Sequence, residues 1–388
     1  MSLRILLILG ALSAFGPLAI DMYLPAFPLL AESFDTSVDH VQLSLAAYFI
    51  GLAIGQLVYG PLADRYGRRG PLLIGVTLFT LASLASAFAP SMDWLIGVRF
   101  VQALGGCAGM VVARAVVRDS ATGTAAARGL AYTSVAMSLT SIFAPSVGSL
   151  LHTVLDWRGS FWLLAVTSLL ALLLGLPRVK ESFQKGAVTG NPFRSYKLLL
   201  LHTRFRHCVT AIGFTSGTFY SFLAAAPGVF MGGLGMSVQE FAIVPMLWGI
   251  GFTAGGLAST RLISYFPPGR LILLGISITV LSGVGLSVMT LLGIRDPYIL
   301  VIPVFLFGLG NALNIPQGMN LALTTAPREI AGAASSVMML SQFFVGTLGS
   351  MIMLALPVDS PVPVALVVTA SALISLAFYL RVGLWKEQ

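Results

Sequence analysis

The sequence predicts an all-α membrane protein with twelve transmembrane helices in two pseudo-symmetric six-helix bundles. Three observations predict this class. The 388-residue chain is 57% hydrophobic and only 9% charged, whereas a soluble domain averages about 25% charged residues. Apolar runs of about 20 residues recur along the chain, and each is long enough to cross a bilayer as a helix. Short sequence patterns also recur in the two halves, as in transporters built from repeats.

Twelve apolar spans follow from the hydropathy pattern. We expect them at residues 5–30, 38–60, 71–90, 93–116, 129–152, 159–177, 206–231, 238–262, 270–292, 297–324, 328–356 and 361–381. An even number of spans puts both termini on one side. With the N-terminus inside, all but four of the 22 Lys and Arg residues lie in cytoplasmic segments; the four exceptions are Arg158, Arg295, Arg99 and Arg114. The positive-inside rule therefore places both termini in the cytoplasm.

The longest polar segment, residues 178–205, divides the chain near its middle. We expect a solvated cytoplasmic linker there, between an N-terminal bundle at 1–177 and a C-terminal bundle at 206–388. Two internal echoes support the division: Gly255 to Ala258 repeats Gly60 to Ala63 at an offset of 195, and Leu309 to Ala312 resembles Leu104 to Cys107. The second half lacks the charges of the first, with Ser259 for Asp64 and Val304 for Arg99, so we expect ion chemistry in the first half.

The stretch Gly60-Pro61-Leu62-Ala63-Asp64-Arg65-Tyr66-Gly67-Arg68-Arg69 joins two predicted spans. Pro61 disfavours a helical conformation at the residue before it, which predicts a loop here. Its arginines cannot lie in lipid and hold this loop in the cytoplasm. Asp119, at the end of the fourth span, is positioned to pair with them. The candidate conformational gate is Gly60, Asp64, Arg65, Gly67, Arg68, Arg69 and Asp119.

Two charges fall inside predicted spans, where they are costly and usually functional. Asp21 interrupts the first span ahead of two prolines, and Arg99 lies about two turns into the fourth. Both occupy the outer half of the bilayer at a similar depth. A carboxylate beside a permanent cation suits a group that takes up and releases a proton.

Aromatic and amide residues in spans of both halves predict a cavity for a drug-sized ligand. Buried amides are the stronger candidates, because they need hydrogen-bond partners. The candidate substrate-binding residues are Asp21, Tyr23, Tyr48, Phe214, Tyr220, Phe222, Trp248, Asn311, Asn314, Gln342, Phe343 and Phe344. Near the middle of the fifth span, Pro145 and Gly148 lie among small residues that let helices bend and pack closely.

Other classes of protein fit less well. The formal charge of +8 is spread between apolar spans and forms no basic domain, which argues against nucleic acid as a partner. The two cysteines and four histidines show no metal-ligand spacing, and no phosphate-binding loop is present, so we expect neither an enzyme nor a metal or organic cofactor. A channel would more plausibly be a symmetric oligomer than a twofold-repeated chain.

The 60–69 stretch resembles the G-x-L-a-D-r-x-G-r-r loop of the major facilitator superfamily. Arg99 to Gly105 is similar to that superfamily's proton-transfer motif, and Ala144 to Gly148 to its antiporter motif, which usually reads G-P-x-x-G-G. Asp21 to Pro28, Arg118-Asp119 and Trp157-Arg158 with Phe161 resemble the bicyclomycin/chloramphenicol-resistance (Bcr/CflA) drug exporters.

That resemblance implies a monomeric drug/proton antiporter of the bacterial inner membrane, powered by the proton gradient. Asp21 would be its proton and substrate carboxylate, Arg99 its coupling partner, and Asp64, Arg68 and Asp119 its gate. Two alternatives stay open: a proton-coupled exporter of an amino acid or other metabolite, and a proton-coupled importer.

Overall fold

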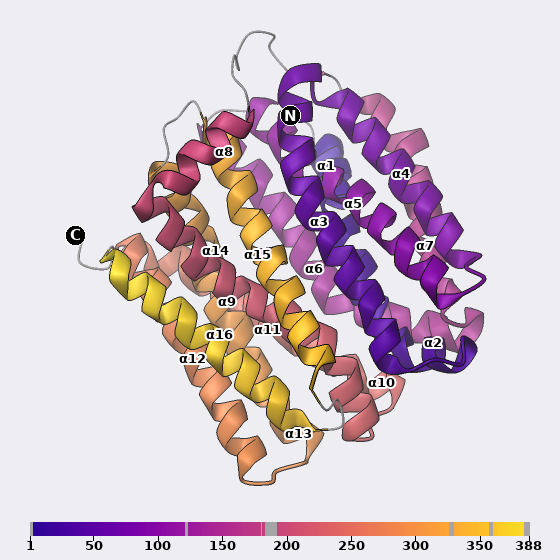
Figure 1. Ribbon diagram of the computed structural model, residues 1–388. Helices are drawn as coiled ribbons and strands as arrows, with labels where there is room; N and C mark the ends of the chain where they lie inside the picture. The colour runs from indigo at the N-terminus through magenta and orange to yellow at the C-terminus, as the bar shows by residue number, and fades with distance from the viewer. Residues whose placement is uncertain are drawn as a thin grey trace. The chain divides into compact units, whose positions relative to one another are not determined.

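The computed structural model describes residues 3–120, 123–179, 181–182, 192–325, 330–356 and 360–383. These residues form helices and turns and contain no β-strand. The chain divides into two compact units, Met1–Gly190 and Asn191–Gln388 (Figure 1). Each unit carries one half of the predicted spans, which confirms the predicted fold class.

Unit 1 contains α1 (Leu3–Asp21), α2 (Phe27–Ser33), α3 (Val38–Tyr66), α4 (Arg69–Ala87), α5 (Met92–Ser120), α6 (Gly123–Leu155) and α7 (Arg158–Leu170). A 3-10 turn links α1 to α2, and a π-helical turn extends α7 toward Arg178. Helix α5 packs against α1, α3 and α4; α1 also packs against α6, and α4 against α7. Helix α5 is therefore the central element of this unit.

Unit 2 contains α8 (Pro192–Leu201), α9 (Thr203–Pro227), α10 (Val238–Phe241), α11 (Ile243–Leu262), α12 (Pro268–Leu291), α13 (Pro297–Leu300), α14 (Ile302–Thr325), α15 (Ala331–Leu354) and α16 (Pro361–Val382). Helix α14 packs against α9, α11 and α12; α9 also packs against α15, and α12 against α16. These are the same pairs as in unit 1, with α14 in the place of α5. The two units therefore repeat one packing scheme.

Glycines at helix crossings define the register of this repeat. Gly55 on α3 allows close approach to Cys107 on α5, and Gly255 on α11 does the same against Leu309 on α14. Gly51 on α3 and Gly251 on α11 are a second such pair. In both pairs, the equivalent residues of α3 and α11 lie 200 positions apart in the chain. The offset of 195 expected from the Gly255 to Ala258 echo is therefore wrong for these helices, because backbone contact, rather than the repeated letters, sets the register.

Eleven helical segments among the described residues are long and apolar enough to cross a membrane. Helix α6 corresponds to the one expected span that is not among these eleven, the span at residues 129–152. Its apolar part is shorter and covers Leu139–Leu155. Two predicted boundaries are wrong by six residues: α3 continues through Pro61 to Tyr66 rather than ending at residue 60, and α6 begins at Gly123 rather than at residue 129. A proline inside a helix removes one backbone hydrogen bond, and the remaining turns hold α3 together, so the expected long loop reduces to Gly67 and Arg68.

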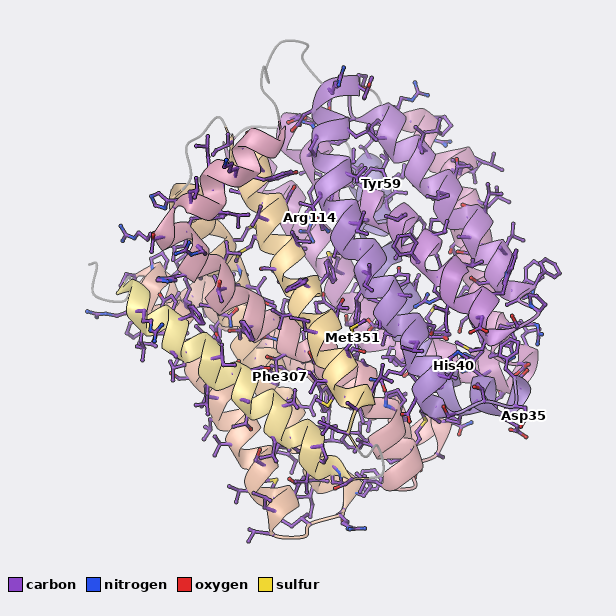
Figure 2. The ribbon with its side chains drawn as sticks, in the orientation of Figure 1. Asp35, His40, Tyr59, Arg114, Phe307 and Met351 are labelled. Atoms are coloured by element: carbon purple, nitrogen blue, oxygen red, sulfur yellow. The ribbon has the colours of Figure 1, made fainter. Side chains whose placement is uncertain are left out.

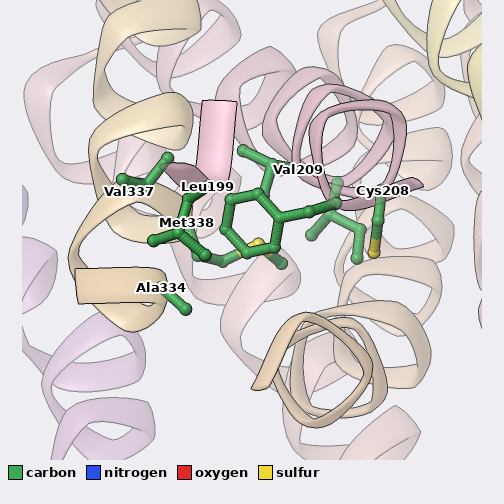
Figure 3. Packing of buried hydrophobic residues seen from close by; sticks show 8 residues of the cluster. Leu199, Cys208, Val209, Ala334, Val337 and Met338 are labelled. Carbon is green, nitrogen blue, oxygen red and sulfur yellow. The ribbon is translucent and has the colours of Figure 1, made fainter. Parts of the chain in front are cut away.

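The segment expected as a solvated linker contains helix α8, which packs against α9 and α15. Leu199 of α8 joins a buried cluster in unit 2 (Figure 3); its members are Leu199, Phe205, Cys208, Val209, Ile212, Ala334, Val337 and Met338. The cluster buries one face of α8, which explains why this part of the linker is ordered as a helix.

Candidate functional site

Asp21 is the last residue of α1, and only 3% of its surface is exposed. The chain then turns through Leu24–Ala26 into α2, because Pro25 and Pro28 cannot donate the backbone hydrogen bonds that would continue α1. Ser141 on α6 hydrogen-bonds the Asp21 carboxyl group, whereas Oδ2 has no hydrogen-bond partner. A buried carboxylate with an open oxygen inside a span is the costly arrangement that marks a functional group.

Arg99 on α5 is fully buried between two aromatic rings. Its guanidinium carbon lies 4.4 Å from the centre of the Tyr23 ring and 4.1 Å from that of Tyr48. Nη1 donates to Gln102 Oε1 at 2.6 Å, while Nε and Nη2 have no hydrogen-bond partner. The rings offer their negative faces to the cation, which stabilises it by about 0.5–2 kcal/mol per contact.

Asp21 and Arg99 share Tyr48 as a neighbour and form no ion pair with each other. No carboxylate among the described residues lies within ion-pair distance of Arg99. Tyr48 lies over Arg99 and within electrostatic range of Asp21, and its hydroxyl donates to the Gly16 carbonyl of α1 at 3.0 Å. The sequence predicted both charges at one depth, and the structure adds a tyrosine that contacts Arg99 and lies within electrostatic range of Asp21.

The 60–69 stretch centres on Arg68. Its Nη1 donates to Asp64 at 2.5 Å and its Nε donates to Asp119 at 2.7 Å, so one guanidinium joins the ends of α3 and α5. Burial alone would lower the pKa of Arg68, but the hydrogen bonds and charges of the two aspartates outweigh it and raise the pKa. Arg65 and Arg69 are exposed, and Gly60 is half-buried within α3.

Glu181 is a member of this cluster that the sequence analysis missed. Its carboxylate accepts hydrogen bonds from the backbone N–H groups of Arg68 at 2.9 Å and Arg69 at 3.1 Å, at the start of α4. A carboxylate at a helix N-terminus satisfies unpaired donors and complements the helix dipole. The sequence signal that could have identified Glu181 is an acidic residue a few positions after the sixth span. On its own, such a residue is a weak indication of a contact with the 60–69 stretch.

Pro145 and Gly148 lie on α6, and both are buried. Gly148 packs against the backbone of Met22, so closely that a Cβ atom at this position would clash with the Met22 carbonyl oxygen. The small residue that the sequence marked thus allows α6 to contact the chain directly after Asp21.

In unit 2, aromatic rings stack around Trp248 on α11. Its ring lies 3.7 Å from that of Phe219 and 5.0 Å from that of Phe252, centre to centre. Phe307, which Figure 2 labels on α14, meets Phe219 edge-on. Of these four residues the sequence predicted only Trp248, because aromatic residues at helical spacing give no indication of which rings will stack.

Two buried amide side chains on α14 lack hydrogen-bond partners. Asn311 and Asn314 are fully buried on α14, and neither side chain makes a hydrogen bond; Trp248 Nε1 also lacks an acceptor. Buried polar groups usually have partners, so these groups are candidates for contacts with water or a ligand.

Tyr220 connects other predicted binding residues of unit 2 to the Trp248 stack, because its ring lies 5.5 Å from that of Phe219, centre to centre. Phe343 packs against Tyr220, with ring centres 5.1 Å apart, and Gln342 contacts the Met339 sulfur on its own helix. Phe222 is buried and Phe214 is half-buried. Phe344 is 56% exposed, so the structure does not support it as a residue of a buried cavity.

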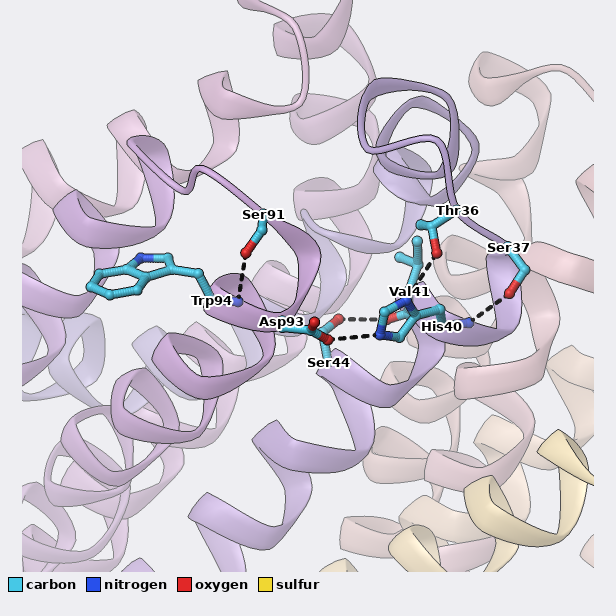
Figure 4. A network of polar contacts seen from close by, with 8 residues as sticks. All are labelled: Thr36, Ser37, His40, Val41, Ser44, Ser91, Asp93 and Trp94. Atoms are coloured by element: carbon cyan, nitrogen blue, oxygen red, sulfur yellow. Dashed lines mark hydrogen bonds and ion pairs between the residues drawn. The ribbon is translucent and has the colours of Figure 1, made fainter.

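A polar network ties together the loops at the end of unit 1 opposite the 60–69 stretch (Figure 4). His40, in the first turn of α3, contacts Asp93 through Nε2 at 3.0 Å and Thr36 through Nδ1 at 2.8 Å. Ser37 caps α3 by accepting from the His40 backbone N–H. Both ring nitrogens of His40 are therefore engaged at the surface of the unit.

The chain consists of two repeated helical units with apolar spans and buried charges. This combination is typical of a membrane transport protein rather than of an enzyme. Comparison with known proteins identifies the family. The family profile described as Major Facilitator Superfamily matches residues 8–350, and this chain belongs to that superfamily. Transporters of this kind need no cofactor and draw energy from an ion gradient.

Several relatives cover nearly the whole chain. An uncharacterised MFS-type transporter, YdgK, of Bacillus subtilis is 31% identical over 100% of this chain and 96% of its own length. A bicyclomycin resistance protein homolog of Haemophilus influenzae is 27% identical over 96% of this chain and 95% of its own length. A chloramphenicol resistance protein of Pseudomonas aeruginosa is 27% identical over 92% of this chain and 85% of its own length.

Among solved structures, the crystal structure of a D-xylose–proton symporter matches with a TM-score of 0.76. The sequences are 16% identical, and the match covers 97% of each chain. At this identity the likeness establishes the fold alone. The protein is thus a multi-pass membrane transporter with the fold of its superfamily.

Proposed function

We propose that this protein is a proton-coupled antiporter that exports drug-like small molecules by alternating access. The observation that carries the proposal is the Asp21 carboxyl group, buried on α1 with Oδ2 open, in the same unit as a buried Arg99 that no carboxylate of the described residues pairs with. A single titratable group that substrate and proton both influence is sufficient to couple their movements.

The drug-like substrate class rests on two further observations. Relatives with 27% identity over nearly the whole chain are named for resistance to bicyclomycin and chloramphenicol. Stacked rings around Trp248 and the open amides of Asn311 and Asn314 offer apolar faces and hydrogen-bonding groups, as drug-sized ligands require. The described part of unit 2 contains no buried charge, which suits neutral substrates.

The setting that we propose is the bacterial inner membrane, with the chain acting as a monomer and both termini in the cytoplasm. The basic residues of the predicted cytoplasmic segments support this orientation. Inward movement of one proton through 100 mV then supplies about 2.3 kcal/mol, which supports roughly 50-fold accumulation of a neutral drug.

The test is transport by the purified protein in liposomes with an imposed pH gradient and chloramphenicol as probe. Asp21→Asn keeps the size and a hydrogen-bonding oxygen but cannot carry a proton, so gradient-driven transport should stop while exchange of labelled for unlabelled drug continues. Gradient-driven transport by Asp21→Asn at the wild-type rate would overturn the assignment of Asp21. A wild-type protein that moves amino acids or sugars, but no drug of a resistance panel, would overturn the substrate class.

A further inference from the structure

The one hydrogen bond of Arg99 is the first of three that connect α5 to α4. Arg99 Nη1 donates to Gln102 Oε1 at 2.6 Å, and Gln102 Nε2 donates to Ser83 Oγ on α4 at 2.8 Å. The Ser83 hydroxyl in turn donates to the Phe79 carbonyl at 2.7 Å. Arg99, Gln102 and Ser83 are all fully buried. These bonds therefore form in a low-dielectric interior, where a missing partner is costly.

The donors and acceptors of these three bonds fit together in one way. A guanidinium group only donates, so the Gln102 amide must turn its oxygen toward Arg99 and its NH₂ group toward Ser83. A serine hydroxyl has one proton, which Ser83 gives to a carbonyl of its own helix, so Ser83 accepts from Gln102. The orientation of the Gln102 amide is therefore fixed from both ends.

The other polar groups around Arg99 give their protons elsewhere. The Ser44 hydroxyl donates to a backbone carbonyl of α3, so the Tyr23 hydroxyl donates to Ser44 at 2.6 Å. The Tyr48 hydroxyl donates to a backbone carbonyl of α1. Both tyrosines thus contact Arg99 with their rings. Among the described residues, Gln102 is the single hydrogen-bond acceptor for the guanidinium group.

Unit 2 offers an internal comparison, because its helices follow the same packing scheme. Gly75 on α4 lies against the Gly105 carbonyl on α5, and Gly275 on α12 lies against the Gly310 carbonyl on α14. Equivalent residues of α4 and α12 are therefore 200 positions apart, and those of α5 and α14 are 205 positions apart.

The polar groups of the three bonds are all missing at the equivalent positions of unit 2. The equivalent pairs are Arg99 and Val304, Gln102 and Phe307, and Ser83 and Gly283. The arginine, the amide and the hydroxyl are thus replaced together, while the helices keep the same partners. The helix packing does not require the amide and the hydroxyl, so we infer that their role is tied to the arginine.

We propose that Gln102 and Ser83 are positioning residues that hold Arg99 for proton coupling. The inference rests on the proposed function, in which Arg99 acts together with the carboxyl group of Asp21. Ser83 fixes the amide, and the amide fixes Nη1. Because the amide is neutral, the guanidinium group keeps its positive charge unpaired. Nε and Nη2 stay open for a partner during the transport cycle.

The test measures drug-driven proton movement in liposomes for Ser83→Ala and its matched control, Ser86→Ala. Both serines are fully buried on α4, and each hydroxyl donates to the carbonyl four residues earlier. Only Ser83 also accepts from Gln102. Ser83→Ala leaves the amide without its acceptor, so we expect the proton-coupled rate to fall about five- to tenfold, with fewer protons moved per drug molecule. Ser86→Ala should match the wild type.

A double-mutant cycle with Gln102→Leu separates positioning from a structural role. Gln102→Leu removes the bond to Arg99 and should itself lower the proton-coupled rate by about tenfold. If Ser83 acts through Gln102, Ser83→Ala should cause no further loss in the Gln102→Leu background. Equal losses in both backgrounds, or wild-type coupling in Ser83→Ala, would overturn the inference and leave the proposed function intact. A wild-type protein that moves no protons with the drug would overturn both.

Discussion

The carboxylate of Glu181 lies directly against Gly67, with Oε2 2.6 Å from the position that a Cβ atom on Gly67 would occupy. Gly67 has a φ of +92°, a conformation that other residues rarely adopt. The backbone can therefore turn sharply between α3 and α4 while Glu181 approaches the N–H groups of Arg68 and Arg69. One glycine thus makes room for the acid that holds the start of α4.

Gly67→Ala should destabilise unit 1, because the new methyl group meets Glu181 and the backbone conformation becomes strained. A residue held in such a conformation costs about 1–3 kcal/mol. Thermal unfolding of the purified protein measures the change. Gly70→Ala is the matched control, since no atom lies within 4 Å of its added Cβ. Equal melting temperatures for the two variants would contradict the prediction.

Glu181→Ala should weaken the start of α4 by about 0.5–2 kcal/mol, as expected for loss of a helix-capping acceptor. Glu181→Gln keeps one acceptor oxygen and should fall between Ala and the wild type. Thermal unfolding in detergent gives the order of the three proteins. If Ala and Gln are equally unstable, the charge of Glu181 matters and its role as an acceptor does not.

Asp64→Asn removes one of the two carboxylates that hold Arg68 and leaves Asp119 in place. We expect turnover to slow by up to about fivefold, equivalent to about 1 kcal/mol for a partly exposed ion pair. Substrate affinity should stay within about twofold of the wild type, because this cluster lies at the end of unit 1 far from Asp21. Glu32→Gln, an exposed acid at the other end, serves as the control. A matching loss of affinity would place Asp64 in the binding site instead.

Arg99→Lys keeps the charge but replaces the flat guanidinium that lies between Tyr23 and Tyr48. Loss of contacts worth about 0.5–2 kcal/mol should lower the proton-coupled rate by up to about 30-fold. The readout is the rate of drug-driven proton movement, together with the number of protons moved per drug molecule. Tyr48→Phe keeps the ring and removes only the bond to Gly16, so it should have the smaller effect. A full wild-type ratio in Arg99→Lys would show that the aromatic enclosure is unimportant for coupling.

The helix repeat predicts paired effects in the two units. Gly251→Ala on α11 should be destabilising by about 1–3 kcal/mol, because its methyl group would clash with the Phe305 carbonyl on α14. Gly51→Ala should act in the same direction, since its methyl group would lie 2.5 Å from the Phe100 carbonyl. Gly256→Ala has open space and is the control. Thermal unfolding that leaves Gly251→Ala as stable as Gly256→Ala would disprove the close crossing.

Features that depend on local sequence could be predicted well. Hydrophobic length is a property of consecutive residues, so the spans followed from the sequence within a few positions, apart from the passage of α3 through Pro61 and the earlier start of α6. An acid or arginine inside such a span is visible for the same reason, which is why Asp21 and Arg99 were found. The density of charge around Arg68 was equally a local signal.

Contacts between distant residues depended on the tertiary structure. Glu181 lies 113 residues from Arg68 in the chain, and Ser160 lies 138 residues from Met22. Whether such residues meet depends on how each helix is rotated about its axis and where it crosses its neighbour. The sequence alone determined that this protein crosses a membrane and carries two buried charges. Only the packing of α1, α5 and α6 decided that Arg99 lies between tyrosines, and that Asp21 keeps an open acceptor, because side-chain partners are set by helix contacts rather than by hydropathy.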